Sequence, residues 1–436
     1  MGQVVGVLIG FLILGLMLAI HELGHYIAGR KLGFTVEEFS IFMGPRLLSW
    51  ERNGIKYTLK LIPIGASVQF AGEYPEHDVP DSELRKGDFY ERPRWARAIT
   101  LLAGPLMNIV TAVIVFGLLY ASVGFATTSV GQVAPDSLAA TAGVVPGDRI
   151  VEIADYKVKT DLDMNIGLIS HDAQLPYDLK VISAGSDTVK TYAIQPATRV
   201  QYMLGVTFAS EDGQPVIYEI DSALNPAASA FVLGDRILMV EGQPVTEENF
   251  VSSVQQHATG VPIQFTVFRG SAETAISVTP VPVDTAVPLG ISLAPNESAL
   301  EAIPYTFSYI WSYTKGTGRV LGQVFQGRIA AKDSLTGPIG IVDMLSGVVT
   351  SERDAGVKFA QLFSMFGMVS LALGTANLLP IAPLDGGQLL LLGIESVRRK
   401  RLSVKAQSII TLAGVLFVLA LALLSLSFDI GRIIGR

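Results

Sequence analysis

The chain has 436 residues, of which half are hydrophobic and only 16% are charged, and it contains no cysteine. This length exceeds a single domain, and the composition excludes a wholly soluble protein. The absence of cysteine excludes disulfides, cysteine-ligated metal sites and thiol nucleophiles. A formal net charge of −7 argues against a nucleic-acid partner. We therefore expect a multi-domain protein of the lipid bilayer.

Four apolar stretches are long enough to cross a bilayer, which takes about 20 helical residues. They cover residues 4–28, 98–123, 359–379 and 409–426. The first stretch lacks the basic leader of a secretory signal and is longer than its apolar core, so we expect it to be retained. The fold class predicted here is a polytopic α-helical membrane protein with four transmembrane helices.

Basic residues gather in the two short loops that join these spans, and none occurs among the first 29 residues. They are Arg30, Lys31, Arg92, Arg94 and Arg97 in the first loop, and Arg398, Arg399, Lys400, Arg401 and Lys405 in the second. The positive-inside rule places both loops in the cytoplasm. We expect a multi-pass protein of a bacterial inner membrane, with both termini and the segment from about 126 to 355 in the periplasm.

The first span contains an HExxH pattern, His21-Glu22-Leu23-Gly24-His25. Residues at i and i+4 share a helix face, so His21 and His25 can bind one metal ion while Glu22 lies beside a bound water. Neutral imidazoles suit Zn²⁺, and a catalytic zinc takes three protein ligands. Polar side chains near the centre of a membrane helix cost roughly 2.5–3.5 kcal/mol each, which favours a functional role.

A third metal ligand is expected where Pro380 and Pro383 interrupt the third apolar stretch, in NLLPIAPLDGG. Prolines break a helix, and a break at membrane depth is tolerated only where the freed backbone faces protein or water. Asp385 follows this break and, like His25, lies close to the basic residues of the cytoplasmic side. We predict that Asp385 completes the site, the alternative being a helix cap.

Residues 133–158 and 223–245 repeat each other, with a shared Gly-Asp-Arg-Ile sequence. Each copy has a short helix, a turn, a β-rich run and a second turn. We expect domains at 126–211 and 212–290 that resemble tandem PDZ domains of the bacterial, circularly permuted kind. Two small β-rich spacer domains are the alternative.

The remaining segments connect these domains to the membrane. Residues 291–355 are expected to form an amphipathic connector, between membrane domains at 1–125 and 356–436. Within the first cytoplasmic loop, 56–73 alternates like a strand pair and is more apolar than a solvated hairpin. It either dips into the membrane or forms an ordinary cytoplasmic hairpin, and the sequence leaves both open.

Together these features resemble the site-2 protease family of intramembrane zinc metalloproteases, in particular its branch of regulator-of-sigma-E proteases. The resemblance covers essentially the whole chain: HExxH in the first span, a distal NxxPxxxLDGG, four spans and two exported PDZ-like domains. It implies that His21, His25 and Asp385 bind zinc and that Glu22 is the general base of a metalloendopeptidase.

The resemblance also implies a substrate-contacting sequence at Asn377 and Pro380, and matches 101–108 to a GPxxN segment of the family. One departure is Ala382, which stands where the family has its second proline. A substrate strand could pair with the hairpin, at Gly65, Ser67, Val68 and Gln69. The implied substrates are single-span membrane proteins, namely anti-sigma factors already cut outside and remnant signal peptides, in an envelope stress response.

Two points stay open from the sequence. The exported domains either filter substrates by size or bind newly exposed peptide C-termini. The competing class of protein is a non-enzymatic PDZ scaffold with a structural zinc clip, which explains the repeats but not Glu22 between the histidines. A metal transporter would need polar residues across several spans, and the second and fourth are nearly free of them.

Overall fold

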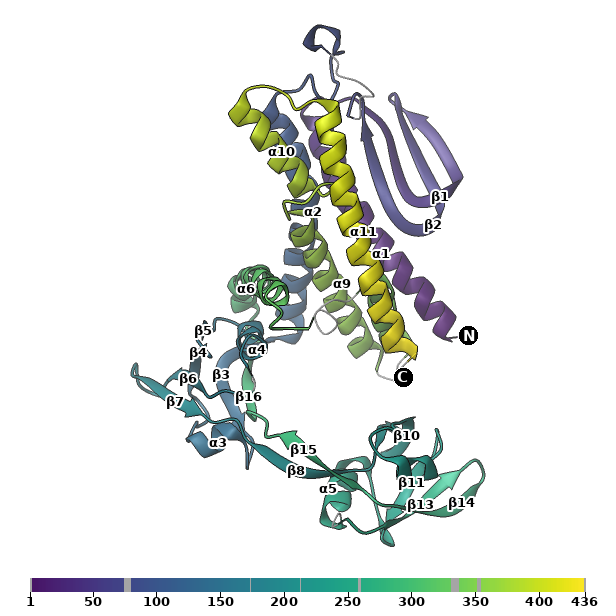
Figure 1. Ribbon diagram of the computed structural model, residues 1–436, viewed down its shortest axis with the longest axis vertical. Helices are drawn as coiled ribbons and strands as arrows, with labels where there is room; N and C mark the ends of the chain where they lie inside the picture. The colour runs from purple at the N-terminus through teal and green to yellow at the C-terminus, as the bar shows by residue number, and fades with distance from the viewer. Residues whose placement is uncertain are drawn as a thin grey trace. The chain divides into compact units, whose positions relative to one another are not determined.

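The computed structural model describes residues 2–73, 80–172, 174–211, 213–257, 260–330, 337–350 and 354–434. The expected boundary at residue 212 and parts of the expected connector 291–355 lie outside these ranges. The chain divides into two compact units, which are treated separately. The first holds residues 1–128, 156–170 and 293–435, and the second holds most of the β-structure between them (Figure 1).

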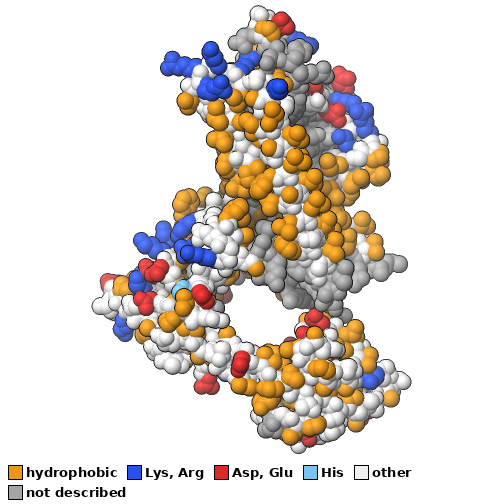
Figure 2. Space-filling model, viewed as in Figure 1, with side chains coloured by type: hydrophobic (Ala, Val, Ile, Leu, Met, Phe, Trp, Pro, Cys, Tyr) orange, Lys and Arg blue, Asp and Glu red, His pale blue; other side chains and the backbone are white. Residues whose placement is uncertain are grey.

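Within the described residues of the first unit, four helices are long and apolar enough to cross a membrane. They are α1 (Gly2–Lys31), α2 (Arg94–Val123), α9 (Ala355–Asn377) and α11 (Val404–Ile434). Each contains or overlaps one predicted span, so the prediction of four such helices is confirmed. Figure 2 shows hydrophobic side chains along the face that carries α11, and Lys and Arg side chains at the end where α10 and α11 join.

Small residues bring the helices of this unit together. Gly24 of α1 lies against the backbone of Ala103 in α2, and Gly374 of α9 lies against the backbone of Pro105. Close backbone approach of this kind is typical of helices packed in membranes. A shorter apolar helix, α8 (Pro338–Thr350), packs on the N-terminal half of α1, where Gly10 meets Val342.

Two long strands, β1 (Val36–Arg52) and β2 (Ile55–Phe70), pair antiparallel between α1 and α2 in the chain. Each strand bends, so that Glu38 pairs both with Lys56 and with Gln69. Residues 66–70 therefore have β1 on one side and form an edge on the other. The expected strand pair at 56–73 is corrected here, because the pairing begins at residue 36.

The second unit is built around two antiparallel sheets. The first sheet has the order β16-β3-β4-β6-β7, and its edge strand β16 comes from beyond residue 290. Its strands are β3 (Phe125–Val133), β4 (Arg149–Ile153), β6 (Tyr177–Ile182), β7 (Val189–Ile194) and β16 (Ile291–Asn296). The short helix α3 (Leu138–Ala142) completes this part, and the short strand β5 (Tyr156–Lys157) belongs to the first unit.

The second sheet has the order β14-β13-β11-β10-β9 and packs on helix α5 (Glu247–His257). Its strands are β9 (Val206–Glu211), β10 (Gln214–Ile220), β11 (Arg236–Val240), β12 (Gln243–Pro244), β13 (Ile263–Arg269) and β14 (Ala272–Val278). A separate pair, β8 (Thr198–Met203) with β15 (Val281–Ala286), precedes and follows this sheet in the chain.

Helix α6 (Ala299–Phe325) lies within the expected amphipathic connector 291–355. Its buried face packs on α2 and on α4 (Asp161–Ile169), which also belongs to the first unit. The Ser312 hydroxyl donates a hydrogen bond to Asp163 Oδ2 at 2.7 Å, and the Tyr305 hydroxyl donates to Asp161 Oδ1 at 2.5 Å. Two acidic side chains of α4 thus fix α6 in place.

Candidate metal centre

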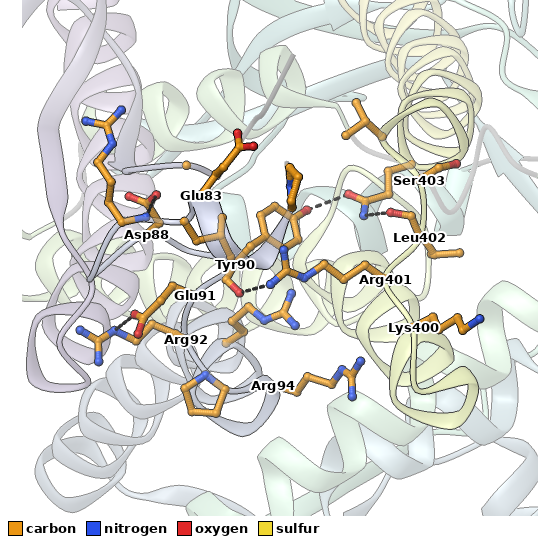
Figure 3. A pocket seen from close by; sticks show the side chains of 18 of the residues that line it. Glu83, Asp88, Tyr90, Glu91, Arg92, Arg94, Lys400, Arg401, Leu402 and Ser403 are labelled. Atoms are coloured by element: carbon orange, nitrogen blue, oxygen red, sulfur yellow. Dashed lines mark hydrogen bonds and ion pairs between the residues drawn. The ribbon is translucent and has the colours of Figure 1, made fainter. Parts of the chain in front are cut away.

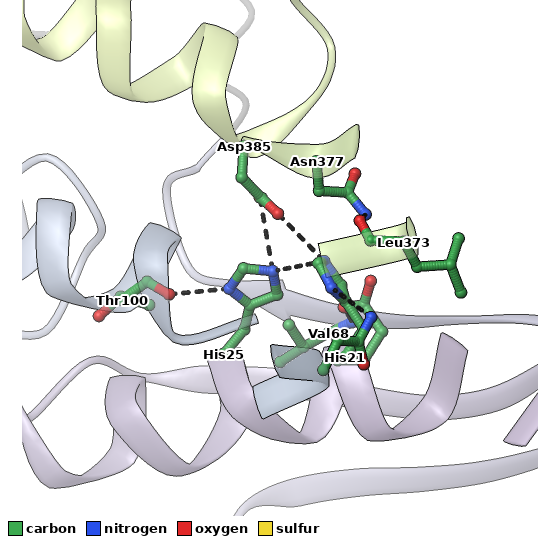
Figure 4. A network of polar contacts seen from close by, with 9 residues as sticks. His21, His25, Val68, Thr100, Leu373, Asn377 and Asp385 are labelled. Atoms are coloured by element: carbon green, nitrogen blue, oxygen red, sulfur yellow. Dashed lines mark hydrogen bonds and ion pairs between the residues drawn. The ribbon is translucent and has the colours of Figure 1, made fainter. Parts of the chain in front are cut away.

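The two histidines of α1 point to one spot (Figure 4). Their Nε2 atoms are 3.2 Å apart, and the residues are 6% and 7% exposed. One helical turn separates His21 from His25, which places both rings on the same face of α1. Both rings are therefore held, out of water, in a position to share one ligand.

Asp385 reaches the same spot from the start of α10 (Asp385–Arg398). Its Oδ2 lies 3.0 Å from Nε2 of His21 and its Oδ1 lies 3.4 Å from Nε2 of His25. The break between α9 and α10 makes this possible, because α9 ends at Asn377 and α10 starts at Asp385. Gly386 packs tightly on the turn, since a Cβ there would meet the Leu378 carbonyl oxygen at 2.2 Å.

His25 is oriented by α2. Its Nδ1 donates a hydrogen bond to the backbone carbonyl of Thr100 at 2.8 Å, which leaves Nε2 unprotonated in the neutral ring. Gly104, one turn further along α2, leaves room for the ring, because a Cβ there would lie 2.2 Å from His25 Nε2. Helix α2 thus fixes both the tautomer and the place of this imidazole.

His21 is oriented by Asn108, which is fully buried in α2. The side-chain amide nitrogen of Asn108 lies 3.4 Å from Nδ1 of His21, while its Oδ1 has no hydrogen-bond partner among the described residues. With the amide oxygen and nitrogen exchanged, Oδ1 faces His21 and accepts the Nδ1–H. Nε2 of His21 is then also unprotonated and faces Asp385.

These atoms fit a zinc ion. Two ligand atoms of a tetrahedral zinc, each bound at about 2.0–2.1 Å, lie about 3.3 Å apart, and the separations of the three groups span 3.0–3.4 Å. With both rings in the tautomer described, the two Nε2 atoms and the carboxylate all offer electron pairs, and Oδ2 of Asp385 receives no hydrogen bond within the described chain. A cation between them removes this repulsion.

Glu22 lies beside this set. One of its carboxylate oxygens and one ring nitrogen of each histidine all lie within 4.8 Å of one another. Its Oε2 accepts a hydrogen bond from the backbone N–H of Val68 at 3.0 Å. Val68 belongs to the edge formed by residues 66–70. The side chain of Glu22 is therefore attached to the free edge of the β1–β2 sheet, next to His21 and His25.

The other expected site residues lie around this centre without joining it. Asn377 donates to the carbonyl of Leu373 in its own helix at 3.0 Å, and Pro380 is exposed in the turn before α10. The Ser67 hydroxyl pairs with the Ser40 hydroxyl at 3.1 Å. Gly65 packs on Met43 of β1, and Gln69 pairs with Glu38 in the sheet.

Three residues of α2 contribute to the centre without having been expected individually: Thr100, Gly104 and Asn108. The GPxxN segment at 101–108 is the signal that could have found two of them, because Gly104 and Asn108 are its first and last letters. Thr100 acts through its backbone carbonyl, so its residue type carries no such signal.

Comparison with known proteins agrees with this geometry. The model of peptidase family M50 matches residues 9–421. A regulator of sigma E protease from Salmonella typhi is 28% identical over 448 residues, covering 96% of this chain and 97% of the relative. Metalloprotease MmpA of Caulobacter vibrioides is 27% identical over 465 residues, covering 98% and 97% of the two chains.

A relative from Mesorhizobium japonicum, provisionally named a zinc metalloprotease, is 29% identical over 427 residues and covers 95% of each chain. The cofactor is zinc, which the predicted donor set suits, and the protein is a multi-pass protein of the inner membrane. From its HExxH helix to its last span, the chain belongs to peptidase family M50, the site-2 protease family of metalloproteases.

Proposed function

We propose that this chain hydrolyses peptide bonds within or near the transmembrane segment of single-span membrane proteins. The observation that carries the proposal is the meeting of His21, His25 and Asp385, with Glu22 beside them, on or next to helices apolar enough to cross a membrane. An isolated structural zinc clip would not need a carboxylate held next to the ligands by the backbone of another element.

In this proposal His21, His25 and Asp385 hold the metal and Glu22 moves the proton. When bound, zinc supplies a Lewis acid that polarises the scissile carbonyl and lowers the pKa of water from about 15.7 to about 7. Glu22 takes a proton from the attacking water and passes it to the leaving amine nitrogen. The Val68 N–H fixes the carboxylate of Glu22 through its Oε2 and leaves Oε1 for that proton.

The edge at residues 66–70 is a natural place for a substrate backbone. A helical substrate must give up internal hydrogen bonds before its peptide bonds can be cut, and strand addition replaces them. Because strand residues alternate in direction, Ala66 offers its N–H on the same side as Val68. Replacing Ala66 by proline should slow cleavage of a helical substrate without loss of zinc, and unchanged cleavage would rule out this step.

We propose that Asn377 and Pro380 hold the other side of the substrate. Both lie in or next to the turn that precedes Asp385, and Pro380 is exposed there. An Asn377→Ala variant should retain zinc but raise KM, since its amide would no longer hold the substrate backbone. A Ser396→Ala variant, which removes a hydroxyl bonded within α10 at the carbonyl of Leu392, serves as a control.

The second unit offers a groove for a peptide. It has a volume of about 380 Å³ and lies between β9, an edge strand, and α5, with Leu204, Phe250 and Val254 in its wall. An edge strand that lies beside an apolar pocket is a common arrangement for peptide binding. We propose that this PDZ-like domain binds the new C-terminus of a substrate already cut outside.

The second unit could act as a tether, which binds the C-terminus of a trimmed substrate, or as a size filter, which excludes large substrates. These two roles make different predictions. Val251 is 48% exposed on the groove, and Val261 is 55% exposed outside the residues that line it. Under the tether, a Val251→Glu variant should cleave a trimmed substrate several-fold more slowly, while Val261→Glu should not. Equal rates for both variants would favour the size filter.

The basic residues at one end of α2 and α11 support a cytoplasmic position for that end and for the metal centre. The second unit and both termini would then lie in the periplasm. Since the chain has no cysteine, single-cysteine variants can be labelled without background. An impermeant thiol reagent added to intact cells with a permeable outer membrane should label Ser186→Cys but not Lys86→Cys, and the reverse pattern would contradict this orientation.

The protease itself is tested with a tagged single-span protein in reconstituted vesicles. A Glu22→Gln variant should bind zinc as the wild type does and should not cleave. A Glu51→Gln variant, changed at an exposed carboxylate of β1, should retain both properties. Cleavage by a zinc-loaded Glu22→Gln variant would reject the role of Glu22, and no cleavage by the wild type would favour the non-enzymatic PDZ scaffold.

The substrate is proposed from the relatives. Three of them carry the name regulator of sigma E protease, which supports an anti-sigma factor, trimmed first on the outside, as the substrate in an envelope stress response. Remnant signal peptides have the same single apolar helix and are proposed as a second class. Comparing intact and trimmed anti-sigma factor in the vesicle assay tests this order of cuts.

A further inference from the structure

A pocket of about 1170 Å³ lies between the segment before α2 and the junction of α10 with α11 (Figure 3). It belongs entirely to the first unit and does not include the metal ligands. Its lining has seven basic side chains, which are Arg85, Arg92, Arg94, Arg97, Arg399, Lys400 and Arg401. It has three acidic ones, which are Glu83, Asp88 and Glu91. The described residues of the lining therefore carry more positive than negative charge.

Several of these charged side chains already have a partner within the protein. Glu91 Oε2 lies 3.3 Å from Arg92 Nε, and Asp88 Oδ2 accepts the backbone N–H of Arg85 at 2.9 Å. Arg97 is paired with the buried Glu395 at 3.5 Å. Two of the three acids of the lining, Asp88 and Glu91, are thus engaged within the segment before α2.

Three cations have no acidic partner within the described chain: Arg94, Arg399 and Lys400. The Nε of Arg94 is also buried, without a hydrogen-bond acceptor among the residues that the structure describes. Arg94 is the first residue of α2, whose start carries no side-chain cap, so the positive end of the helix dipole adds to these charges. An anion in the pocket would supply the missing acceptor and offset the repulsion among these cations.

The walls of the pocket are held in place by Tyr90. Arg401 Nη2 donates to the backbone carbonyl of Tyr90 at 2.7 Å. Burial raises the pKa of the Tyr90 hydroxyl, which stays protonated and donates to Gln407 Oε1 at 2.8 Å. The first turn of α11 and Arg401 are therefore joined to the segment before α2, which holds the two walls of the pocket together.

The pocket lies where two candidate membrane spans begin, at Arg94 and Val404. Apolar side chains are exposed directly along these helices: Trp95 is 61% exposed, Ile99 47% and Ile409 59%. Tryptophan is typical of the membrane interface. A ligand here would meet cations at one end and hydrocarbon-facing surface at the other.

We propose that this pocket binds the phosphate of an anionic phospholipid, with its acyl chains along the exposed sides of α2 and α11. Basic pockets between membrane helices are suited to such headgroups. Phosphatidylglycerol carries an uncompensated negative charge, whereas phosphatidylcholine brings its own cation into a pocket that already holds unpaired ones. The site goes beyond the proposed protease activity and does not depend on it.

The test measures binding of short-chain lipids to the full-length protein in neutral detergent. Dioctanoyl phosphatidylglycerol should bind saturably, and dioctanoyl phosphatidylcholine at least tenfold more weakly. An Arg94→Gln, Arg399→Gln, Lys400→Gln variant should lose at least tenfold in affinity for phosphatidylglycerol. A variant of equal charge, Arg46→Gln, Arg52→Gln, Lys60→Gln, changes the β1–β2 sheet and should bind as the wild type does.

A third variant separates charge from folding: Arg94→Lys, Arg399→Lys, Lys400→Arg retains every charge and should restore most of the binding. Equal binding of both lipids, or equal losses in the two neutralised variants, would overturn the proposal. Inorganic phosphate and glycerol phosphate are tested in parallel. If either bound as tightly as phosphatidylglycerol, the site would be one for soluble phosphates and the lipid assignment would be wrong.

Discussion

The carboxylate of Glu22 accepts a hydrogen bond from the backbone N–H of Val68 at 3.0 Å, so the proposed general base is attached to the edge of the β1–β2 sheet. This contact joins a residue of the first span to strand β2. The opposite edge of β2 pairs with β1. The sheet therefore does more than pack against α1, because it sets the position of the group proposed to transfer the proton.

Replacing Val68 by proline removes this N–H and should lower kcat by about tenfold to a hundredfold, since a misplaced base transfers protons poorly. Zinc content should stay the same, because no ligand is touched. Val68→Ala retains the backbone donor and should cleave nearly as fast as the wild type. Equal loss in both variants would mean that the valine side chain matters rather than its N–H.

Gly104→Ala should abolish zinc binding. The added Cβ would lie 2.2 Å from His25 Nε2, the atom that faces Asp385. The ring would have to move, and a displaced ligand loses most of its metal affinity. Gly117 is a matched control on the same helix, because a Cβ there would meet nothing closer than the Thr306 hydroxyl at 4.0 Å. The measurement is the zinc content per protein after dialysis, determined by mass spectrometry. Gly104→Ala should have lost its zinc, and Gly117→Ala should have retained it.

The spans and the metal motif could be read from the sequence because each depends on local spacing. Hydropathy defines the four helices, and the i, i+4 rule places His21 beside His25. Asp385 could be inferred because two prolines break an apolar stretch ahead of it. Its approach to within 3.0 Å of His21 Nε2 could not be inferred, since it depends on how α10 packs against α1 and α2.

What the sequence did not reveal depends on tertiary contacts. The carbonyl of Thr100 orients His25 only because α2 lies against α1 at that height, and any residue type offers a carbonyl. The first strand, β1, was missed because its pattern of buried side chains does not alternate beyond its first few residues. Helix α8 has 13 residues, too few to count as a span by hydropathy.

Asn108→Leu should weaken zinc binding by about tenfold to a hundredfold, the usual effect of removing the partner of a metal-binding histidine. Leucine has a similar volume but cannot accept the Nδ1–H of His21. Asn108→Asp supplies a carboxylate acceptor and should retain zinc. If Asn108→Asp lost zinc as Asn108→Leu does, the amide would be needed as a donor, and the tautomer assigned to His21 would be wrong.

A buried ion pair connects α2 to α10 and thereby supports both halves of the metal centre. Arg97 Nη1 lies 3.5 Å from Glu395 Oε2, and the two side chains are 5% and 4% exposed. Removing one partner leaves the other charge buried, so Arg97→Met should lower the free energy of unfolding by about 3–5 kcal/mol. Changing both, as Arg97→Met with Glu395→Gln, should recover much of this loss, because the glutamine oxygen still accepts from Leu402 N–H.

Thermal unfolding in detergent measures these differences, with Arg398→Met as the control at an exposed position of α10. The single variant should unfold several degrees earlier than the control and the double variant closer to it. Because Asp385 begins the helix that Glu395 anchors, the single variant should also release zinc more readily at a temperature where it is still folded. A double variant less stable than Arg97→Met would show that Glu395 acts mainly through Leu402 and Gln407, and not as the counter-charge of Arg97.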